Sequence, residues 1–181
     1  IKFKDSAYAA NLASNPNYNS NSFKYVYSSL TTPSTIYSQS FSLNNKKKIW
    51  QQTFNNFEEK NYKTMRVWIK ARDGQKIPVS LIYRKGVTLK SAPLFMYGYG
   101  SYGLIVEPSF KLSFLPLVDE GFIFAIAHIR GGQDLGREWY DQGRMMNKMN
   151  TFFDFIDCTK GLHEKKFGNK EKTFAMGGSA G

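Results

Sequence analysis

The stretch KTFAMGGSAG, residues 172–181, decides the fold of this chain. Its first half, Lys172 to Met176, is short and mainly apolar, which predicts a buried β-strand. Its second half, residues 177–181, is a G-x-S-x-G motif with Ser179 at its centre. A strand followed at once by a serine between glycines is typical of a nucleophile elbow, a turn too sharp for neighbours that carry a Cβ atom. The pattern predicts that the Ser179 hydroxyl stands above the edge of a sheet.

The residues before this stretch alternate between predicted strands and helices. The runs 93–97 and 122–127 are almost continuously apolar, as strands covered on both faces are. Further strands are expected at 65–71 and 77–84, joined by an Asp73-Gly74 turn, and helices at 110–120, ending at Gly121, and at 151–167, ending at Gly168. In the second helix the apolar residues Met149, Phe152, Phe153 and Ile156 share one face. This order predicts an α/β protein, the first half of an α/β-hydrolase core entered through an antiparallel hairpin.

The first part of the chain follows a different pattern. It is rich in Ser, Asn and Tyr, and apolar residues alternate with polar ones at 23–27 and 35–41. Turns are expected at 30–34 and at Asn44-Asn45, with a further strand at 48–51. These segments predict a meander of short antiparallel strands without helices, such as one propeller blade or a small sheet.

Composition excludes several classes of protein. A hydrophobic content of 41% in 181 residues supports a packed core and excludes a disordered chain. The single cysteine, Cys158, excludes an internal disulfide framework and predicts a reducing compartment, the cytoplasm. No apolar run reaches the roughly 18 residues of a membrane span. The net charge of +11 is dispersed, with Lys46-Lys47-Lys48 the densest run, so we expect a solvated basic surface rather than nucleic-acid binding.

Three loops are expected at the carboxyl edge of the parallel strands, where ligands of α/β sheets bind. The first is 97–103, whose glycines allow close backbone approach and whose tyrosines can donate to a developing oxyanion. The second, 128–132, begins with His128, which we interpret as a packed structural histidine because this fold places the catalytic histidine after the serine. The third is the elbow at Ser179. No metal or cofactor is expected.

Taken in order, these segments resemble the prolyl oligopeptidase family of serine peptidases, and within it the oligopeptidase B branch. The resemblance covers the whole chain, because 27–33, 71–74 and 78–81 also fit. The segments that carry it are YGYGSYG at 97–103, HIRGG at 128–132 with Leu135-Gly136 and Trp139-Tyr140, KMNTF at 148–152 with Asp154-Phe155, and MGGSAG at 176–181. It implies that residues 1–62 are the C-terminal end of a β-propeller and that residues 63–181 are an incomplete peptidase domain ending at the elbow.

The resemblance also implies a role for individual residues. Ser179 matches the nucleophile, the hydroxyl of Tyr99 matches an oxyanion donor, and the backbone N–H of Ala180 is the second donor. Tyr102 matches an aromatic residue of the substrate pocket. The loop 130–132 is interpreted as architectural.

The same branch cleaves short peptides after Arg or Lys and binds their side chains with carboxylates. Glu107 fits the first position of an expected acidic pair, but Ser109 stands at the second, which removes one charge-assisted contact. The expected partners are therefore short basic peptides, with neither nucleic acid nor membrane involved.

A serine without a base is a poor nucleophile. We expect the triad Asp and His to lie after residue 181, in the missing C-terminal half of the same enzyme, and the 181 residues alone to be inactive. Alternatives are cleavage after proline, as in prolyl oligopeptidase itself, an esterase or lipase on the same fold, and an inactive truncated remnant. Sequence beyond residue 181 would separate the last of these from the enzyme.

Overall fold

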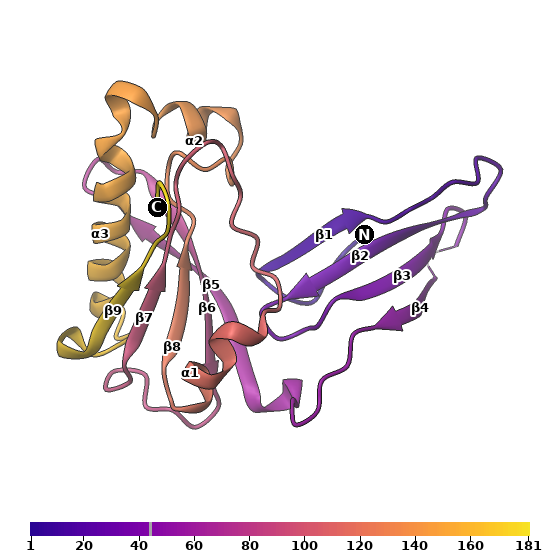
Figure 1. Cartoon of the computed structure of the whole chain (residues 1–181), viewed down its shortest axis with the longest axis horizontal. Coiled ribbons are helices and arrows are strands. Elements are labelled where there is room, and N and C mark those ends of the chain that lie inside the picture. The colour runs from indigo at the N-terminus through magenta and orange to yellow at the C-terminus, as the bar shows by residue number, and fades with distance from the viewer. Residues whose placement is uncertain (44) are drawn as a thin grey trace.

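The computed structural model describes residues 1–43 and 45–181. Two sheets lie beside each other, and the chain passes from one to the other only once, between β4 and β5 (Figure 1). The first sheet is antiparallel, with the order β1-β2-β3-β4. The second has the order β5-β6-β8-β7-β9 and is flanked by helices, so the chain combines an antiparallel meander with a mixed α/β sheet.

The first sheet confirms the predicted meander and adds one strand to it. Its strands are β1 Tyr8–Leu12, β2 Ser22–Ser29, β3 Thr35–Ser40 and β4 Lys46–Gln51. Aromatic side chains occupy one face, where the rings of Tyr25 and Tyr37 stack at 5.5 Å on neighbouring strands. Such cross-strand aromatic pairs stabilise a sheet whose strands are short. Of the turn expected at Asn44-Asn45, Asn44 lies outside the described residues.

The second sheet is built as the apolar pattern predicts. A hairpin of β5 Tyr62–Lys70 and β6 Lys76–Arg84 joins β8 Ile123–Ala127 in antiparallel fashion. The remaining pairs, β7 Leu94–Tyr97 with β8 and with β9 Thr173–Met176, are parallel. The carboxyl ends of β7, β8 and β9 therefore meet at one edge of the sheet.

The expected helix over 110–120 is much shorter in the structure. Only α1, Leu115–Asp119, is helical, after a 3₁₀ turn at Leu112–Phe114. Pro116 explains the difference, because proline has no N–H to donate and is tolerated only in the first turn of a helix. The short helix α2, Arg137–Asp141, was not predicted at all. Further 3₁₀ turns lie at Glu59–Asn61, Met145–Asn147 and Lys170–Lys172.

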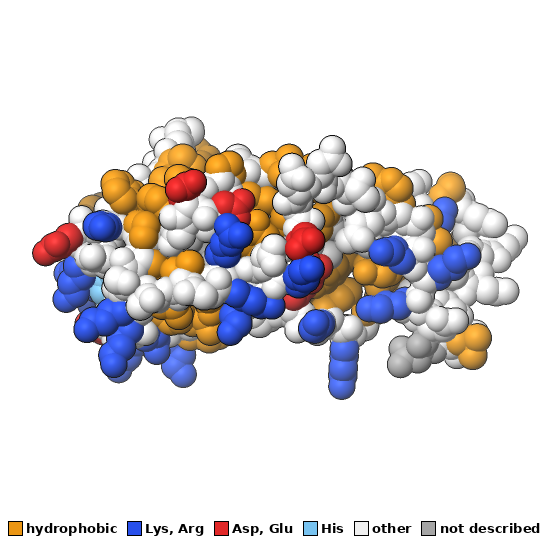
Figure 2. Space-filling model, turned by 90° about the horizontal axis from the view of Figure 1, so that it is seen from below, with side chains coloured by type: hydrophobic (Ala, Val, Ile, Leu, Met, Phe, Trp, Pro, Cys, Tyr) orange, Lys and Arg blue, Asp and Glu red, His pale blue; other side chains and the backbone are white. Residues whose placement is uncertain are grey.

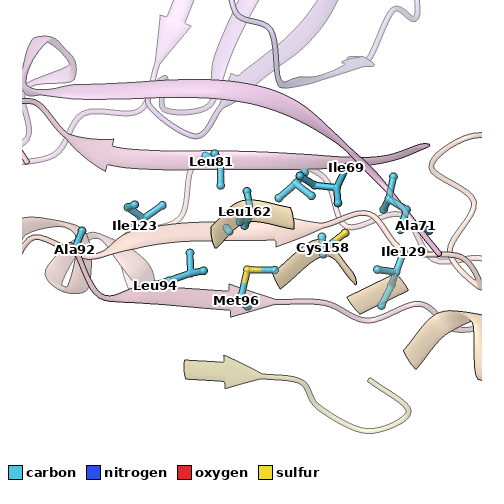
Figure 3. Packing of buried hydrophobic residues seen from close by; sticks show 14 of the residues in the cluster. Ile69, Ala71, Leu81, Ala92, Leu94, Met96, Ile123, Ile129, Cys158 and Leu162 are labelled. Carbon is cyan, nitrogen blue, oxygen red and sulfur yellow. The ribbon is translucent and has the colours of Figure 1, made fainter. Parts of the chain in front are cut away.

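The long helix α3, Met149–Glu164, covers one face of the second sheet. Its residues Cys158 and Leu162 lie over strand side chains such as Leu81 and Met96 (Figure 3). The face expected from the apolar pattern is not the buried one, since Met149, Phe152 and Ile156 are 53%, 50% and 43% exposed. The helix is instead turned so that Thr151 and Asp154 are buried. These polar side chains bind loop groups at the sheet edge, which holds the helix in that orientation.

Strand β9 was predicted to be buried and is exposed in the described structure. It is the edge strand, and Phe174 and Met176 are each about half exposed. The opposite face of the sheet is closed by a second cluster that joins α1 to Leu30, in the turn between β2 and β3. That cluster fixes the first sheet against the second.

Charge is spread over the surface. Figure 2 shows Lys and Arg side chains distributed along the length of one face, between apolar patches. None of the helices in the described part of the chain has the length and apolar character required to cross a bilayer.

Candidate active site

The loops that follow β7, β8 and β9 lie at the same sheet edge because the three strands are parallel. The predicted site residues other than Glu107 belong to the first and third of these loops. The site is therefore assembled from segments that are far apart in the chain.

The elbow at Ser179 has the backbone of a tight turn. Ser179 is exposed and has φ of +55°, in the left-handed region that residues with a Cβ rarely adopt. The N–H of Gly181 donates to the carbonyl of Gly178 at 2.8 Å and closes the turn. A Cβ atom on Gly177 would lie 2.5 Å from the carbonyl carbon of Gly181, so only glycine fits there. This strained turn directly after β9 presents the serine side chain above the sheet.

The two glycines before Ser179 should respond differently to substitution. Gly177→Ala should lower the free energy of unfolding by about 1–3 kcal/mol, because the new methyl group overlaps backbone that cannot move without opening the turn. Gly178→Ala is the matched control, since its Cβ would have no atom within 4 Å, and it should change stability by less than about 0.5 kcal/mol. Thermal unfolding of the protein that carries this segment measures both. Equal stability of the two variants would contradict the turn geometry.

The elbow lies directly against the loop that carries Tyr99. A Cβ atom on Gly181 would be 2.9 Å from the Tyr99 ring carbon Cδ2 and 3.1 Å from the carbonyl oxygen of Gly98. The hydroxyl of Ser101 donates to the carbonyl of Ala180 at 3.3 Å. The predicted nucleophile and the two predicted oxyanion donors are therefore held together by the contact between these loops.

Tyr102 also lies near the elbow. It has φ of +57° and is 72% exposed. Together with Ala180 it lines a hollow of about 330 Å³, which Tyr140, Arg144 and Lys148 also line. The hollow lies beside the elbow, where the sequence predicts the substrate pocket.

Glu107 does not join these residues. Its carboxylate is exposed and accepts a hydrogen bond from the side-chain amide of Asn11 at 3.1 Å. That contact points it to the first sheet, and Glu107 does not line the hollow beside Tyr102. Its role in substrate binding stays a prediction.

His128 is packed, as the sequence analysis expects. It is 2% exposed, and its Nε2 and Nδ1 lie 2.7 Å from Ser80 Oγ and 2.8 Å from Asp134 Oδ1. This Ser-His-Asp chain has the order of a catalytic triad, but Ser80 is completely buried within β6. A nucleophile that no substrate can reach does no chemistry, so the three residues tie the sheet to the loop after β8.

The other histidine, His163, makes its side-chain contact away from Ser179. His163 Nε2 lies 2.9 Å from the hydroxyl of Thr173, at the start of β9, whereas Ser179 follows its end. Burial and the charge of Lys170 lower the pKa of His163. Neither histidine of the 181 residues is therefore placed to deprotonate Ser179.

Comparison of this chain with known proteins identifies its family. The model of the prolyl oligopeptidase family matches residues 108–181. A protein named dipeptidyl aminopeptidase BI, from Pseudoxanthomonas mexicana, is 44% identical over the whole of this chain. The chain belongs to the prolyl oligopeptidase family. A protein of Moraxella lacunata named protease 2 is 34% identical, again over the whole chain.

The same family appears among solved structures. Oligopeptidase B from Trypanosoma brucei, with covalently bound antipain, superposes with a TM-score of 0.89 at 38% identity over 99% of this chain. The chain spans about a quarter of the length of its relatives, 25% and 26% of the two curated ones and 26% of the solved one. The family is one of serine peptidases, which agrees with the exposed serine of the elbow.

Arg130, in the loop interpreted as architectural, is the centre of a buried ion-pair network. Its guanidinium binds Asp154 of α3 through two bonds of 2.8 and 2.6 Å, and Asp73 of the hairpin turn at 2.6 Å. Its backbone N–H also donates to Asp154 at 3.0 Å. These bonds raise the pKa of Arg130. The network joins the loop after β8 to α3 and to the hairpin.

Lys148 begins the segment 148–152 that carries the family resemblance, but the sequence assigned it no role. Its Nζ donates to the carbonyl of Gly100 at 2.7 Å and to Ser101 Oγ at 2.6 Å. Burial lowers the pKa of this lysine. No local sequence pattern predicts these two hydrogen bonds, because the acceptors lie 47 and 48 positions earlier in the chain.

Over residues 1–43 and 45–181, no three His, Cys, Asp or Glu residues are grouped so that they could hold a metal ion. The chemistry available at this edge is that of a serine hydroxyl, tyrosine hydroxyls and backbone N–H groups.

Proposed function

We propose that these 181 residues are the part of a serine peptidase that carries the nucleophile. Ser179 attacks the scissile carbonyl, while the Tyr99 hydroxyl and the Ala180 N–H donate to the oxyanion of the tetrahedral intermediate. The serine proton passes through a base supplied by another part of the enzyme to the leaving amine, the C–N bond breaks to give the acyl-enzyme, and water then hydrolyses the ester. The observation that carries this proposal is the left-handed backbone of Ser179 in a tight turn between a parallel strand and the Tyr99 loop. That geometry has a cost in strain, which is typical of functional positions.

We also propose the division of the chain into two parts. Residues 1–62 would be the C-terminal end of a β-propeller, which the four-stranded antiparallel meander supports. Residues 63–181 would be the first half of an α/β-hydrolase domain, which the parallel strands before the elbow support.

The proposed substrates are short peptides cleaved after Arg or Lys. The likeness to oligopeptidase B from Trypanosoma brucei supports this preference. Among the described residues, the hollow beside Tyr102 is lined by two cations, Arg144 and Lys148, and by no carboxylate. The carboxylates that bind a basic side chain would therefore be supplied by residues outside this segment.

Two other specificities need to be separated from this one. Several curated relatives and solved neighbours are named as prolyl endopeptidases or prolyl oligopeptidases, and one relative is named for dipeptidyl aminopeptidase activity. We expect the full-length enzyme to cleave an N-blocked peptide amide ending in Arg at least tenfold faster, by kcat/KM, than one ending in Pro. A third substrate, a dipeptide amide that ends in Arg and has a free amino group, tests for dipeptidyl aminopeptidase activity in the same assay. Exclusive cleavage of the Pro substrate, or of the free-amine dipeptide, would overturn the proposed specificity.

The isolated 181 residues should not cleave any of these peptides. Both of their histidines are engaged away from Ser179, so the segment offers no base to that hydroxyl. Hydrolysis of the Arg peptide by the isolated segment, abolished by Ser179→Ala, would show that a different group acts as base.

A further inference from the structure

One ammonium group contacts both loops that form the candidate oxyanion site. Lys148 lies at the N-terminal end of α3, and its Nζ donates to the carbonyl of Gly100, the residue directly after Tyr99. The same Nζ donates to Ser101 Oγ, whose proton is directed to the carbonyl of Ala180. A continuous chain of hydrogen bonds therefore runs from the neighbour of one oxyanion donor to the residue that supplies the other.

The Tyr99 loop depends on such external contacts for its shape. Gly100 has φ of +63°, and its backbone lies so close to the loop after β8 and to α3 that a Cβ would be 2.4 Å from Thr151 Cγ2. The carbonyl of Gly100 has a second, longer contact to the Thr151 hydroxyl at 3.4 Å. The short bond from Lys148 is thus the stronger of the two that orient this peptide group.

The charge of Lys148 makes these bonds strong. Both of its named acceptors, a carbonyl and a hydroxyl oxygen, are uncharged, so the ammonium is half-buried among dipoles rather than in an ion pair. Charge-assisted hydrogen bonds are about twice as strong as neutral ones. A methionine side chain of similar length would fill the space and make neither bond.

We propose that Lys148 is a positioning residue for catalysis, which holds Tyr99 and Ala180 in register as oxyanion donors through Gly100 and Ser101. The inference rests on the proposed function, because it gives Lys148 its effect through the two donors assigned there. It predicts a loss in the chemical step rather than in substrate binding, since the contacts fix groups that act on the transition state.

The first test is a set of substitutions in the full-length enzyme, with active sites counted by a fluorophosphonate that labels the nucleophilic serine. Lys148→Met should lower kcat about 10- to 100-fold and change KM by less than about twofold. Lys148→Arg, which keeps the charge and the donors, should recover most of kcat. Lys160→Met is the matched control on an exposed lysine of the same helix and should leave both parameters unchanged. An unchanged kcat for Lys148→Met, or a loss confined to KM, would overturn the proposal.

The second test separates positioning from general stability. If Lys148 acts through Tyr99, then Lys148→Met should cost much less in kcat when Tyr99 is already Phe than when it is Tyr. Full additivity of Lys148→Met and Tyr99→Phe would overturn the inference. Ser101→Ala removes the bond from Lys148 to Ser101 and the bond from Ser101 to Ala180, but it keeps the bond from Lys148 to Gly100. It should therefore give a smaller loss than Lys148→Met and be non-additive with it. Absence of peptidase activity and of serine labelling in the unmodified full-length protein would instead contradict the proposed function itself.

Discussion

Replacing Ser179 with alanine should remove the peptidase activity of the full-length enzyme almost completely. Loss of the nucleophile in a serine peptidase lowers kcat by about 10⁶-fold, and what remains comes from transition-state stabilisation without the covalent step. Covalent labelling by a fluorophosphonate should disappear at the same time, because the reagent forms its bond with the same hydroxyl. Initial rates with the Arg peptide, measured together with in-gel detection of the label, check both results.

The control for this substitution is Ser91→Ala. Ser91 is exposed in the segment before β7, and its hydroxyl makes one local bond to the carbonyl of Thr88. Its loss should leave activity and labelling unchanged. Persistent labelling of Ser179→Ala would place the nucleophile at another hydroxyl and overturn the assignment of Ser179.

The second large effect is expected at the buried ion pair. Asp154→Asn should lower the free energy of unfolding by about 3–5 kcal/mol. The Arg130 side chain is only 4% exposed, and the substitution leaves it with the more accessible Asp73 as its one charged partner. The substitution keeps the volume of the side chain, so the loss reports on charge rather than on a cavity. Urea unfolding at constant m-value measures it.

Asp141→Asn is the matched comparison for charge. Asp141 binds Arg137 and Arg144 at the surface, where all three side chains are at least 40% exposed. Solvent screens such pairs, so the loss should be below about 1 kcal/mol. Equal effects at Asp154 and Asp141 would mean that the Arg130 network contributes nothing beyond an ordinary surface contact.

The strands of the second sheet could be predicted because their signal is local. Continuous apolar runs predicted β7 and β8, and an Asp-Gly turn predicted the β5–β6 hairpin. The first strand, β1, was missed because Tyr8–Leu12 has only two aromatic or branched apolar side chains and little alternation. The orientation of α3 was also beyond the sequence pattern. Its buried face is decided by Thr151 and Asp154, whose partners come from other elements.

In the candidate site, too, some residues are marked by a local sequence pattern and others are brought together only by the fold. Ser179 and the Tyr99 loop were identified as candidates because glycine spacing marks them in the sequence and a strand precedes each, whereas the role of Tyr99 came from the family resemblance. Lys148 was quoted only as part of the segment 148–152, since its hydrogen-bond partners belong to a loop that only the fold brings to it. Glu107 was placed by resemblance alone, and its contact with Asn11 depends on how the two sheets meet.

The left-handed backbone at the elbow has a consequence for which nucleophiles this site accepts. A β-branched side chain is strongly disfavoured at φ near +55°, whereas serine and cysteine carry a single heavy atom on Cβ. Of the two aliphatic hydroxyl residues, threonine is thus excluded by backbone conformation before its chemistry is considered. The turn therefore selects the primary alcohol of serine over the secondary alcohol of threonine at this position.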